Sequence, residues 1–262
     1  MTHFEKLRAA SRARDSLVCV GLDPDPERIP GGARGAVAFC LDLVERTSDL
    51  ACCYKPNSAF WEQYGADGWH ALAELISGIP ADIPVLLDAK RADMGNTMRA
   101  YARAVFDALG ASAVTAHAYQ GSDSLIEFTG RADRGVYVVC RSSNPGAADL
   151  QHLNAPDRPL YMRVAELAVR MNEHANVGLV VGATAPAEIA EVRAACPDIP
   201  FLIPGIGAQG GDLEGSVAAA WNGDPASCLI ASSRSVMYAS DQAVAARELR
   251  DQIRGALHRL PG

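Results

Sequence analysis

Charged residues are concentrated in one short segment, LLDAKRADMGNT at residues 86–97. Asp88 and Lys90 end an apolar run that is typical of a buried strand, and Asp93 follows at the turn into the next helical segment. Successive side chains of an extended strand point to opposite faces, so we predict that Asp88 and Lys90 point the same way. A lysine with carboxylates on both sides keeps its proton, which indicates a general acid rather than an imine-forming amine.

Lys55 ends another apolar run, ACCYK at residues 51–55, and adds a second cation beside these carboxylates. A single Asp–Lys pair would most simply be a salt bridge at the rim of the fold. A group of two cations and two carboxylates is different, because desolvating several ions costs kilocalories each and is seldom offset by stability alone. We therefore predict a catalytic role for this group of charges.

A glycine-rich segment, FLIPGIGAQGGD at residues 201–212, is the second chemical signal, and IASSRSV at residues 230–236 follows the next apolar run. Loops after the seventh and eighth strands of (β/α)8 barrels commonly bind phosphate, because glycines let backbone N–H groups approach an anion. Glycine-rich turns occur in every barrel and are weak evidence alone. With the fixed positive charge of Arg234, the two segments predict a phosphate site.

Eight short apolar runs must position these residues, and they are nearly continuous rather than alternating. This pattern predicts strands that are buried on both faces of a parallel sheet. The runs are residues 17–22, 51–55, 83–88, 112–116, 135–140, 177–182, 199–203 and 227–231. Helical segments between them fit either a closed barrel or a doubly wound open sheet. The count of eight and the chain length favour one α/β domain, a (β/α)8 TIM barrel spanning residues 1–262.

The helical segments show apolar periodicity and start signals. They are residues 34–49, 67–77, 95–109, 122–131, 159–175, 186–195, 212–221 and 241–257, with Asp212, Pro186 and Asp241 suited to caps or first turns. The longest irregular stretch, residues 141–158, follows the fifth strand. Long loops in compact domains are often functional, and we predict that this one is a lid.

Composition and missing motifs exclude several classes of function. The net charge is −7 without a run of Lys or Arg, so we expect neither nucleic acid nor an anionic membrane as a partner. The polar start and the absence of a long apolar stretch predict a cytoplasmic protein. Walker and GxSxG sequences are absent, which argues against nucleotide hydrolysis and serine hydrolysis.

Metal and disulfide sites are not expected either. Seven cysteines lack CxxC spacing and mostly lie in apolar runs, which predicts buried reduced thiols. His117 is expected to be a structural hydrogen-bonding histidine, because no HxH or HExxH spacing supports a metal site.

The segment DAKRAD at residues 88–93 resembles the DxKxxD signature of the orotidine 5'-phosphate decarboxylase family, in the variant where Arg91 follows the lysine. The resemblance spans nearly the whole barrel. The family segments recur in order as GLDPD, YKPNSAF, DAKRADMGNT, SSNPGA, PGIGAQGGD and SSRS. Met94 and Ser233 stand where the commoner family pattern has isoleucine and glycine.

The resemblance implies a set of site residues and a dimer. The catalytic residues would be Lys90, Asp88, Lys55 and Asp93. The substrate-binding residues would be Asp23 for a ribose hydroxyl, Ser143 for the pyrimidine ring, and Thr97, Pro204, Gln209 and Arg234, with Gln209 and Arg234 on the phosphate. The family is dimeric, and Asp93 and Thr97 would reach into the partner subunit's site. The Gln209 loop would close over the phosphate.

The implied reaction converts orotidine 5'-phosphate to uridine 5'-phosphate and CO2 in de novo pyrimidine biosynthesis. It would use neither metal nor cofactor, so electrostatics must stabilise a C6 carbanion that Lys90 then protonates. One alternative is a metal-dependent sugar-phosphate lyase of the same superfamily, which needs acidic ligands where Lys55 stands. Another is a non-catalytic barrel that binds a phosphate ligand, which would not require Lys90 beside Asp88.

Overall fold

The eight predicted strands form one parallel sheet in the order β2-β1-β8-β7-β6-β5-β4-β3. The computed structural model describes residues 1–206 and 211–260. The strands are β1 Val18–Gly21, β2 Cys53–Lys55, β3 Leu86–Arg91, β4 Ala113–Ala116, β5 Gly135–Arg141, β6 Val177–Val181, β7 Phe201–Ile203 and β8 Cys228–Ser232. Each overlaps its predicted run, which confirms the strand predictions. β3 differs most, because it continues three residues past the predicted end at Asp88.

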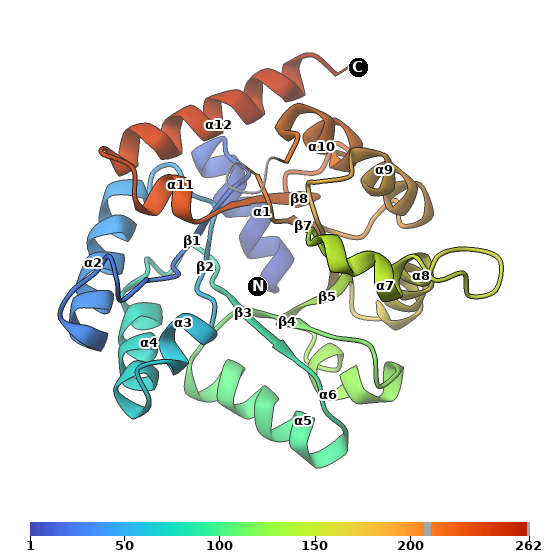
Figure 1. The fold of residues 1–262 in the computed structure, drawn as a ribbon, viewed down its shortest axis with the longest axis horizontal. Helices are drawn as coiled ribbons and strands as arrows, with labels where there is room; N and C mark the ends of the chain where they lie inside the picture. The colour runs from blue at the N-terminus through green and yellow to red at the C-terminus, as the bar shows by residue number, and fades with distance from the viewer. Residues whose placement is uncertain (207–210, 261–262) are drawn as a thin grey trace.

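The sheet closes on itself where β2 meets β3. Isolated parallel bridges join Tyr54 to Val85 and Asn57 to Asp88. The backbone N–H of Asp88 also donates to the carbonyl of Pro56 at 2.9 Å. Helices surround the strands on the outside (Figure 1), so the fold is the predicted (β/α)8 barrel and the open-sheet alternative is excluded.

Helices follow the strands as predicted, with some additions. They are α1 His3–Arg14, α2 Gly32–Thr47, α3 Ala59–Glu62, α4 Ala66–Gly78, α5 Gly95–Ala102, α6 Ile126–Thr129, α7 Ala148–Gln151, α8 Leu160–Met171, α9 Pro186–Ala195, α10 Leu213–Ala220, α11 Arg234–Met237 and α12 Gln242–His258. The side chains of Asp212 and Asp241 accept hydrogen bonds from backbone amides of the first turns of α10 and α12. Pro186 is the first residue of α9. The predicted helix at 95–109 changes to π-helical geometry after α5, over Arg103–Ala108.

The stretch at 141–158 is less irregular than predicted. It contains a 3-10 turn at Pro145–Ala147 followed by α7. The Gln151 side chain holds the start of the stretch, because its Oε1 accepts from the Ser142 amide at 2.9 Å and its Nε2 donates to the Ser142 hydroxyl at 2.8 Å. Two short helical turns are too brief to produce a periodic pattern in the sequence, and the role of this stretch as a lid stays a prediction.

The α1 helix covers the end of the barrel at which the strands begin (Figure 1). Phe4 and Leu7 pack with Leu86 and Tyr137 in a core inside the barrel. Arg8 forms an ion pair at 2.6 Å with Asp224, which precedes β8. A second, larger core lies between the strands and the outer helices. With one end of the barrel covered in this way, the carboxyl ends of the strands remain for a ligand.

His3 makes this end of the barrel sensitive to acid. Its ring is buried, with nitrogens 3.1 Å from the Ser112 hydroxyl and 3.4 Å from the Tyr137 hydroxyl. Burial, helped by the charge of Lys6, lowers the pKa of His3 from 6.5 to about 3. The unfolded chain therefore binds more protons than the folded chain between these two values.

We expect His3 to lower the free energy of unfolding by about 2 kcal/mol when the pH falls from 7 to 5. The loss should grow further as the pH approaches the pKa of His3 in the folded chain. Urea denaturation at the two pH values measures the difference, and His3→Gln should lose this part of it. His70→Gln, at an exposed position on α4, is the matched control and should keep the wild-type difference. An unchanged pH dependence in His3→Gln would contradict the expectation.

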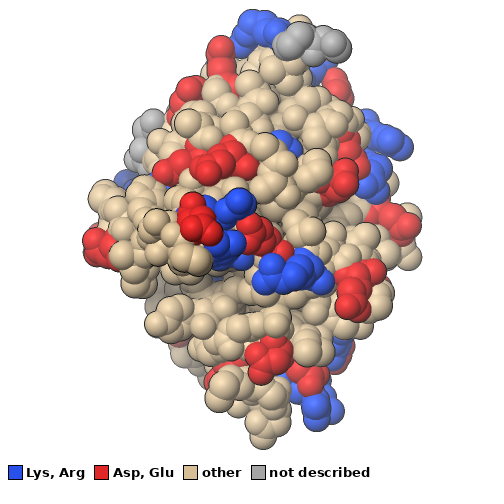
Figure 2. All heavy atoms as spheres, turned by 90° about the vertical axis from the view of Figure 1, so that its right-hand side faces the viewer, with Lys and Arg blue, Asp and Glu red and all other residues tan. Residues whose placement is uncertain are grey.

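Acidic and basic side chains are interspersed on the face shown in Figure 2. That face therefore offers no basic patch of the kind that binds nucleic acid. Across residues 1–206 and 211–260, no helix combines the length and the apolar character that spanning a membrane requires.

Candidate active site

The seam between β2 and β3 brings the predicted charges together. Lys55 is the last residue of β2, and its Nζ lies 3.2 Å from Oδ2 of Asp88. Lys90 Nζ lies 2.7 Å from the other oxygen, Oδ1. The Lys55 and Asp88 side chains are only 7% and 11% exposed, whereas that of Lys90 is 46% exposed. Asp88 thus joins one buried ammonium group to one that faces solvent and can reach a ligand.

Both buried groups stay charged. Burial opposes ionisation of Asp88, but the positive charges of Lys55 and Lys90 outweigh it and hold the pKa of this carboxyl well below 3.8. Burial likewise opposes protonation of Lys55, yet the negative charges of Asp88 and Asp23 raise the pKa of its ammonium group above 10.5. The site therefore presents a fixed carboxylate between two ammonium groups.

Lys90 reaches Asp88 by a different backbone path from the predicted one. Its φ is 44°, in the left-handed region that residues other than glycine rarely adopt. The pairing of β3 with β4 also shifts register between Leu87 and Arg91. The predicted contact between Asp88 and Lys90 is present, but a local distortion produces it rather than the alternation of an extended strand.

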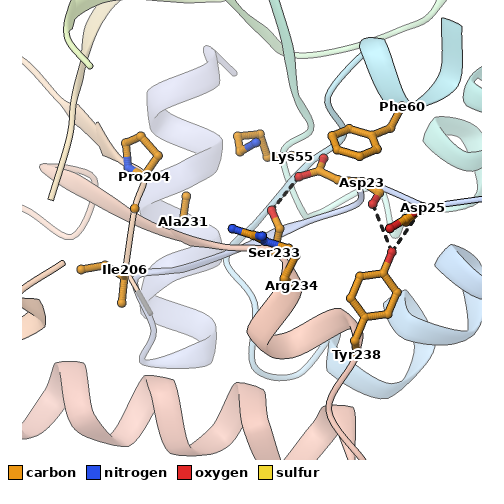
Figure 3. A pocket seen from close by; sticks show the side chains of 11 residues that line it. Asp23, Asp25, Lys55, Phe60, Pro204, Ile206, Ala231, Ser233, Arg234 and Tyr238 are labelled. Atoms are coloured by element: carbon orange, nitrogen blue, oxygen red, sulfur yellow. Dashed lines mark hydrogen bonds between the residues drawn. The ribbon is translucent and has the colours of Figure 1, made fainter. Parts of the chain in front are cut away.

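Asp23 follows β1 and is held from two sides. Its Oδ1 accepts from the Asn57 amide at 3.0 Å, and its Oδ2 accepts from the Ser233 hydroxyl at 2.7 Å. Figure 3 shows Asp23, Lys55 and Arg234 around one pocket, which has a volume of about 220 Å³. Pro204, predicted to bind substrate, lines the same pocket. The pocket thus combines a cation with a preorganised hydrogen-bond acceptor.

Arg234 supplies the exposed positive charge of the pocket. It is the first residue of α11 and forms no ion pair within the described part of the chain. The preceding residue, Ser233, has φ −110° and needs none of the conformational freedom of glycine. The serine in place of the common family glycine instead donates a hydrogen bond to Asp23.

Gly21, at the end of β1, provides the space for the Ser233 side chain. A Cβ atom added at Gly21 would lie 1.8 Å from the Ser233 hydroxyl oxygen and 2.7 Å from its Cβ. We expect Gly21→Ala to lower the free energy of unfolding by about 1–3 kcal/mol, because the added methyl group overpacks this site. The change should also raise the KM for the substrate that binds in this pocket, because it displaces Ser233, the hydrogen-bond partner of Asp23. Urea denaturation and steady-state kinetics measure the two effects.

The compensating variant Gly21→Ala/Ser233→Gly removes the atoms that clash and should recover most of the lost stability. Gly146→Ala is the matched control, because an added Cβ there meets nothing closer than 3.5 Å. If Gly21→Ala proved as stable as the wild type, the steric account of this pair would be wrong.

Some predicted residues are not brought together within one chain. Among the described residues, Asp93 forms no ion pair with either lysine, and its Oδ1 accepts from the Met94 amide at 2.8 Å. Thr97 lies in the first turn of α5, on the same segment. Ser143 lies beyond β5, close to the backbone of Gly182 after β6. Gln209 lies outside the described residues.

Sequence reasoning missed Asn57 and Thr115. The Asn57 side chain donates to Asp88 Oδ2 at 3.4 Å while its amide holds Asp23, and its place after Lys55 in YKPN was an available signal. Thr115 donates to Asp88 Oδ1 at 2.8 Å from within β4. No signal marked Thr115, because it lies inside an apolar run as an ordinary β-branched strand residue would.

The backbone amide of His117 donates to the Arg91 carbonyl at 3.0 Å, and a structural hydrogen-bonding role for its ring stays a prediction. Burial lowers its pKa, and the nearby charge of Lys90 lowers it further. Within the described residues, no group of three or more His, Cys, Asp or Glu side chains is placed to hold a metal ion.

The buried charges and the adjoining Arg234 pocket define a (β/α)8-barrel protein with a charged pocket at the carboxyl ends of its strands. A family model described as the orotidine 5'-phosphate decarboxylase / HUMPS family matches residues 16–249. The chain belongs to this family, as the sequence resemblance predicted.

Individual relatives agree with the family model over almost the full length. The chain is 50% identical to an orotidine 5'-phosphate decarboxylase of Roseiflexus castenholzii, and the match covers 98% of this chain and 99% of that protein. It is 47% identical to one from Cupriavidus necator, with 99% and 98% covered. The solved structure of Leishmania donovani OMP decarboxylase has a TM-score of 0.93 and 45% identity, and covers 99% of this chain and 100% of that one.

Proposed function

We propose that this chain is a carboxy-lyase that converts orotidine 5'-phosphate to uridine 5'-phosphate and CO2 in pyrimidine biosynthesis, without metal or cofactor. The observation that carries the proposal is the Lys55–Asp88–Lys90 network beside the Arg234 pocket. It combines a fixed carboxylate, a solvent-facing ammonium group and a pocket that is lined by Arg234, and the decarboxylase relatives described above support the same reaction.

Binding would begin at the phosphate, for which Arg234 and the Pro204 backbone segment, both lining the pocket, would provide the site. Asp23 would accept a hydrogen bond from a ribose hydroxyl, because its carboxylate is already oriented by Asn57 and Ser233. Ser143 would hold the pyrimidine ring. Contacts far from the reacting carbon can contribute their binding energy to loop closure and exclusion of water. Gln209, outside the described residues, is proposed as a further phosphate ligand.

The chemistry follows from the charges at the end of β3. Asp88 is ionised, so it would repel the substrate carboxylate and raise the energy of the bound ground state. The bond between C6 and the carboxylate breaks, CO2 leaves, and the electron pair remains on C6. The Lys90 ammonium group stabilises this carbanion and then transfers a proton to C6, after which solvent returns a proton to Lys90.

The test is the ultraviolet-monitored conversion of orotidine 5'-phosphate by protein treated with EDTA. We expect rapid decarboxylation that survives chelation. An inactive protein, or one that requires added magnesium, would refute the assignment and favour a metal-dependent sugar-phosphate lyase. Binding of the nucleotide without turnover would instead favour the non-catalytic phosphate-binding barrel.

A homodimer in which Asp93 and Thr97 complete the partner's site is part of the proposal. It is supported by the position of Asp93, whose carboxylate does not reach the charges of its own chain within the described residues. The neighbouring Met94 is 61% exposed, which suits a segment that contacts another subunit. We also propose that residues 1–262 act as one catalytic domain in the cytoplasm, where the seven buried free thiols would stay reduced.

Hybrid dimers test the crossing of Asp93. Lys90→Ala and Asp93→Ala are each expected to be nearly inactive. If Asp93 acts in the partner's site, each hybrid dimer has one site with both changes and one with neither. Random reassociation of equal amounts should then restore about a quarter of the wild-type activity. A mixture that remains as inactive as its components after confirmed subunit exchange would place Asp93 in its own chain's site.

A further inference from the structure

The hydroxyl group of Thr115 lies between the two functional groups of the signature segment. Thr115 belongs to β4 and is 1% exposed. Its Oγ1 accepts a hydrogen bond from the Lys90 backbone amide at 2.9 Å and donates one to Asp88 Oδ1 at 2.8 Å. The same carboxylate oxygen receives Lys90 Nζ at 2.7 Å. One buried hydroxyl therefore contacts the carboxylate of Asp88 and the backbone of Lys90, the two residues that this ion pair joins.

The directions of these hydrogen bonds follow from the groups themselves. An ionised carboxylate only accepts and a backbone amide only donates. The single hydroxyl proton of Thr115 must therefore go to Asp88, which leaves an oxygen lone pair for the Lys90 amide. No rotation of the hydroxyl satisfies both partners in another way.

The Lys90 amide needs this partner because the sheet does not supply one. The pairing of β3 with β4 continues through Leu87 with Val114 and resumes only at Arg91 with Ala116. Lys90 lies in the interruption with a φ of 44°. A strained backbone conformation persists only where its surroundings hold it in place. Among the described residues, the Thr115 hydroxyl is the acceptor that holds the Lys90 amide.

We propose that Thr115 is a positioning residue that fixes the backbone of Lys90 and the Oδ1 atom of Asp88 relative to each other. The hydroxyl sets the direction in which the lysine leaves β3, and hence where its ammonium group meets the substrate. This inference rests on the proposed roles of Lys90 and Asp88. Thr115 touches neither the substrate nor the reacting carbon, so its effect passes through these two residues.

Valine and serine separate this role from simple core packing. Thr115→Val keeps the shape of the side chain but removes both hydrogen bonds. Thr115→Ser keeps the hydroxyl but leaves out the methyl group. If Thr115 only fills space, serine is the more harmful change. If it positions Lys90, valine should lower kcat far more than serine does.

Steady-state kinetics on orotidine 5'-phosphate provide the first measurement. We expect Thr115→Val to lower kcat about 10- to 100-fold with KM changed less than about 3-fold, and Thr115→Ser to stay within about 3-fold of the wild type, because a misplaced catalytic group costs rate rather than ground-state binding. Thr47→Val is the matched control, since this buried threonine bonds to the Tyr54 hydroxyl and the Leu43 carbonyl instead. It should keep kcat even where it lowers stability.

A second measurement does not depend on turnover. The chain has three lysines, Lys6, Lys55 and Lys90, so lysine-selective 15N labelling gives three side-chain signals that single substitutions can assign. Thr115→Val should move the Lys90 signal, and Thr115→Ser should leave it near the wild-type position. Lys6, at the other end of the barrel, should not move in either variant.

The outcomes distinguish the two proposals. Wild-type protein that fails to decarboxylate would refute the proposed function, and the lysine signals would still test the placement of Lys90. Equal kcat in Thr115→Val and the wild type, or an unmoved Lys90 signal in Thr115→Val, would overturn the role of Thr115. A serine variant as impaired as the valine variant would overturn it as well.

Discussion

Lys90→Ala is expected to lower kcat for orotidine 5'-phosphate by about 10⁴-fold or more. The substitution removes the proposed proton donor, which contributes roughly 10²–10⁴-fold, and the charge that stabilises the carbanion, which contributes roughly 10²–10³-fold. KM should change little, because the proposed phosphate and ribose contacts lie elsewhere. The folded structure should persist, since the Lys90 side chain is 46% exposed. Decarboxylation is followed by ultraviolet absorbance with a large excess of enzyme.

Lys6→Ala provides the matched control. Lys6 lies in α1, which covers the opposite end of the barrel, so the same substitution there should leave kcat within about 2-fold of the wild type. A Lys90→Ala variant that kept more than a tenth of the wild-type kcat would rule out Lys90 as the proton donor.

Asp88→Ala is expected to cost about 3–5 kcal/mol of stability in addition to abolishing activity. It leaves the ammonium group of Lys55 buried without its carboxylate, and an uncompensated buried charge is strongly destabilising. The carboxylate pKa lies below 3.8 in the folded chain, so this stability is fully present above that pH and is lost as the pH falls towards the folded value. Urea denaturation at pH 7 measures the loss.

The double variant Lys55→Met/Asp88→Leu should recover much of this stability, because apolar residues can replace a buried ion pair at little cost. It should remain inactive, which separates folding from chemistry. Asp42→Ala breaks an ion pair with Arg46 on the exposed surface of α2 and should cost no more than about 1 kcal/mol. An equal loss for Asp42→Ala and Asp88→Ala would show that burial of the Lys55–Asp88 pair has no special importance.

Strand placement and the main charges could be predicted from the sequence because both depend on local patterns. Apart from the ends of β3 and β5, the strands are buried on both faces, so their apolar runs are nearly continuous. Lys55 and Asp88 stand where such runs end, and the carboxyl ends of parallel strands meet at one end of a barrel. The charged residues of the candidate site could therefore be predicted before any contact was known. The direction in which each side chain leaves its strand was less predictable.

The remaining features depend on contacts that the sequence does not display. The left-handed backbone at Lys90 lies where the pairing of β3 with β4 is interrupted, and its amide is held by Thr115, 25 positions away in the chain. Thr115 reads as a core residue, because its polar role exists only once Asp88 lies beside it. The proposed contribution of Asp93 needs a second subunit. The family pattern pointed to Ser233 as a departure, yet only the space above Gly21 explains how serine is accommodated.

The closing seam of the barrel has an evolutionary consequence. β2 and β3 are joined by isolated bridges, and the Lys55–Asp88 ion pair crosses the same seam. The residues proposed to perform the chemistry therefore also complete the architecture. A lineage drifting towards another reaction could not simply discard these charges, because losing one of them would loosen the barrel at its least continuous point. Because apolar residues can replace the pair at little cost only when both charges change together, each single replacement would be destabilised, which would favour long retention of the charged pair.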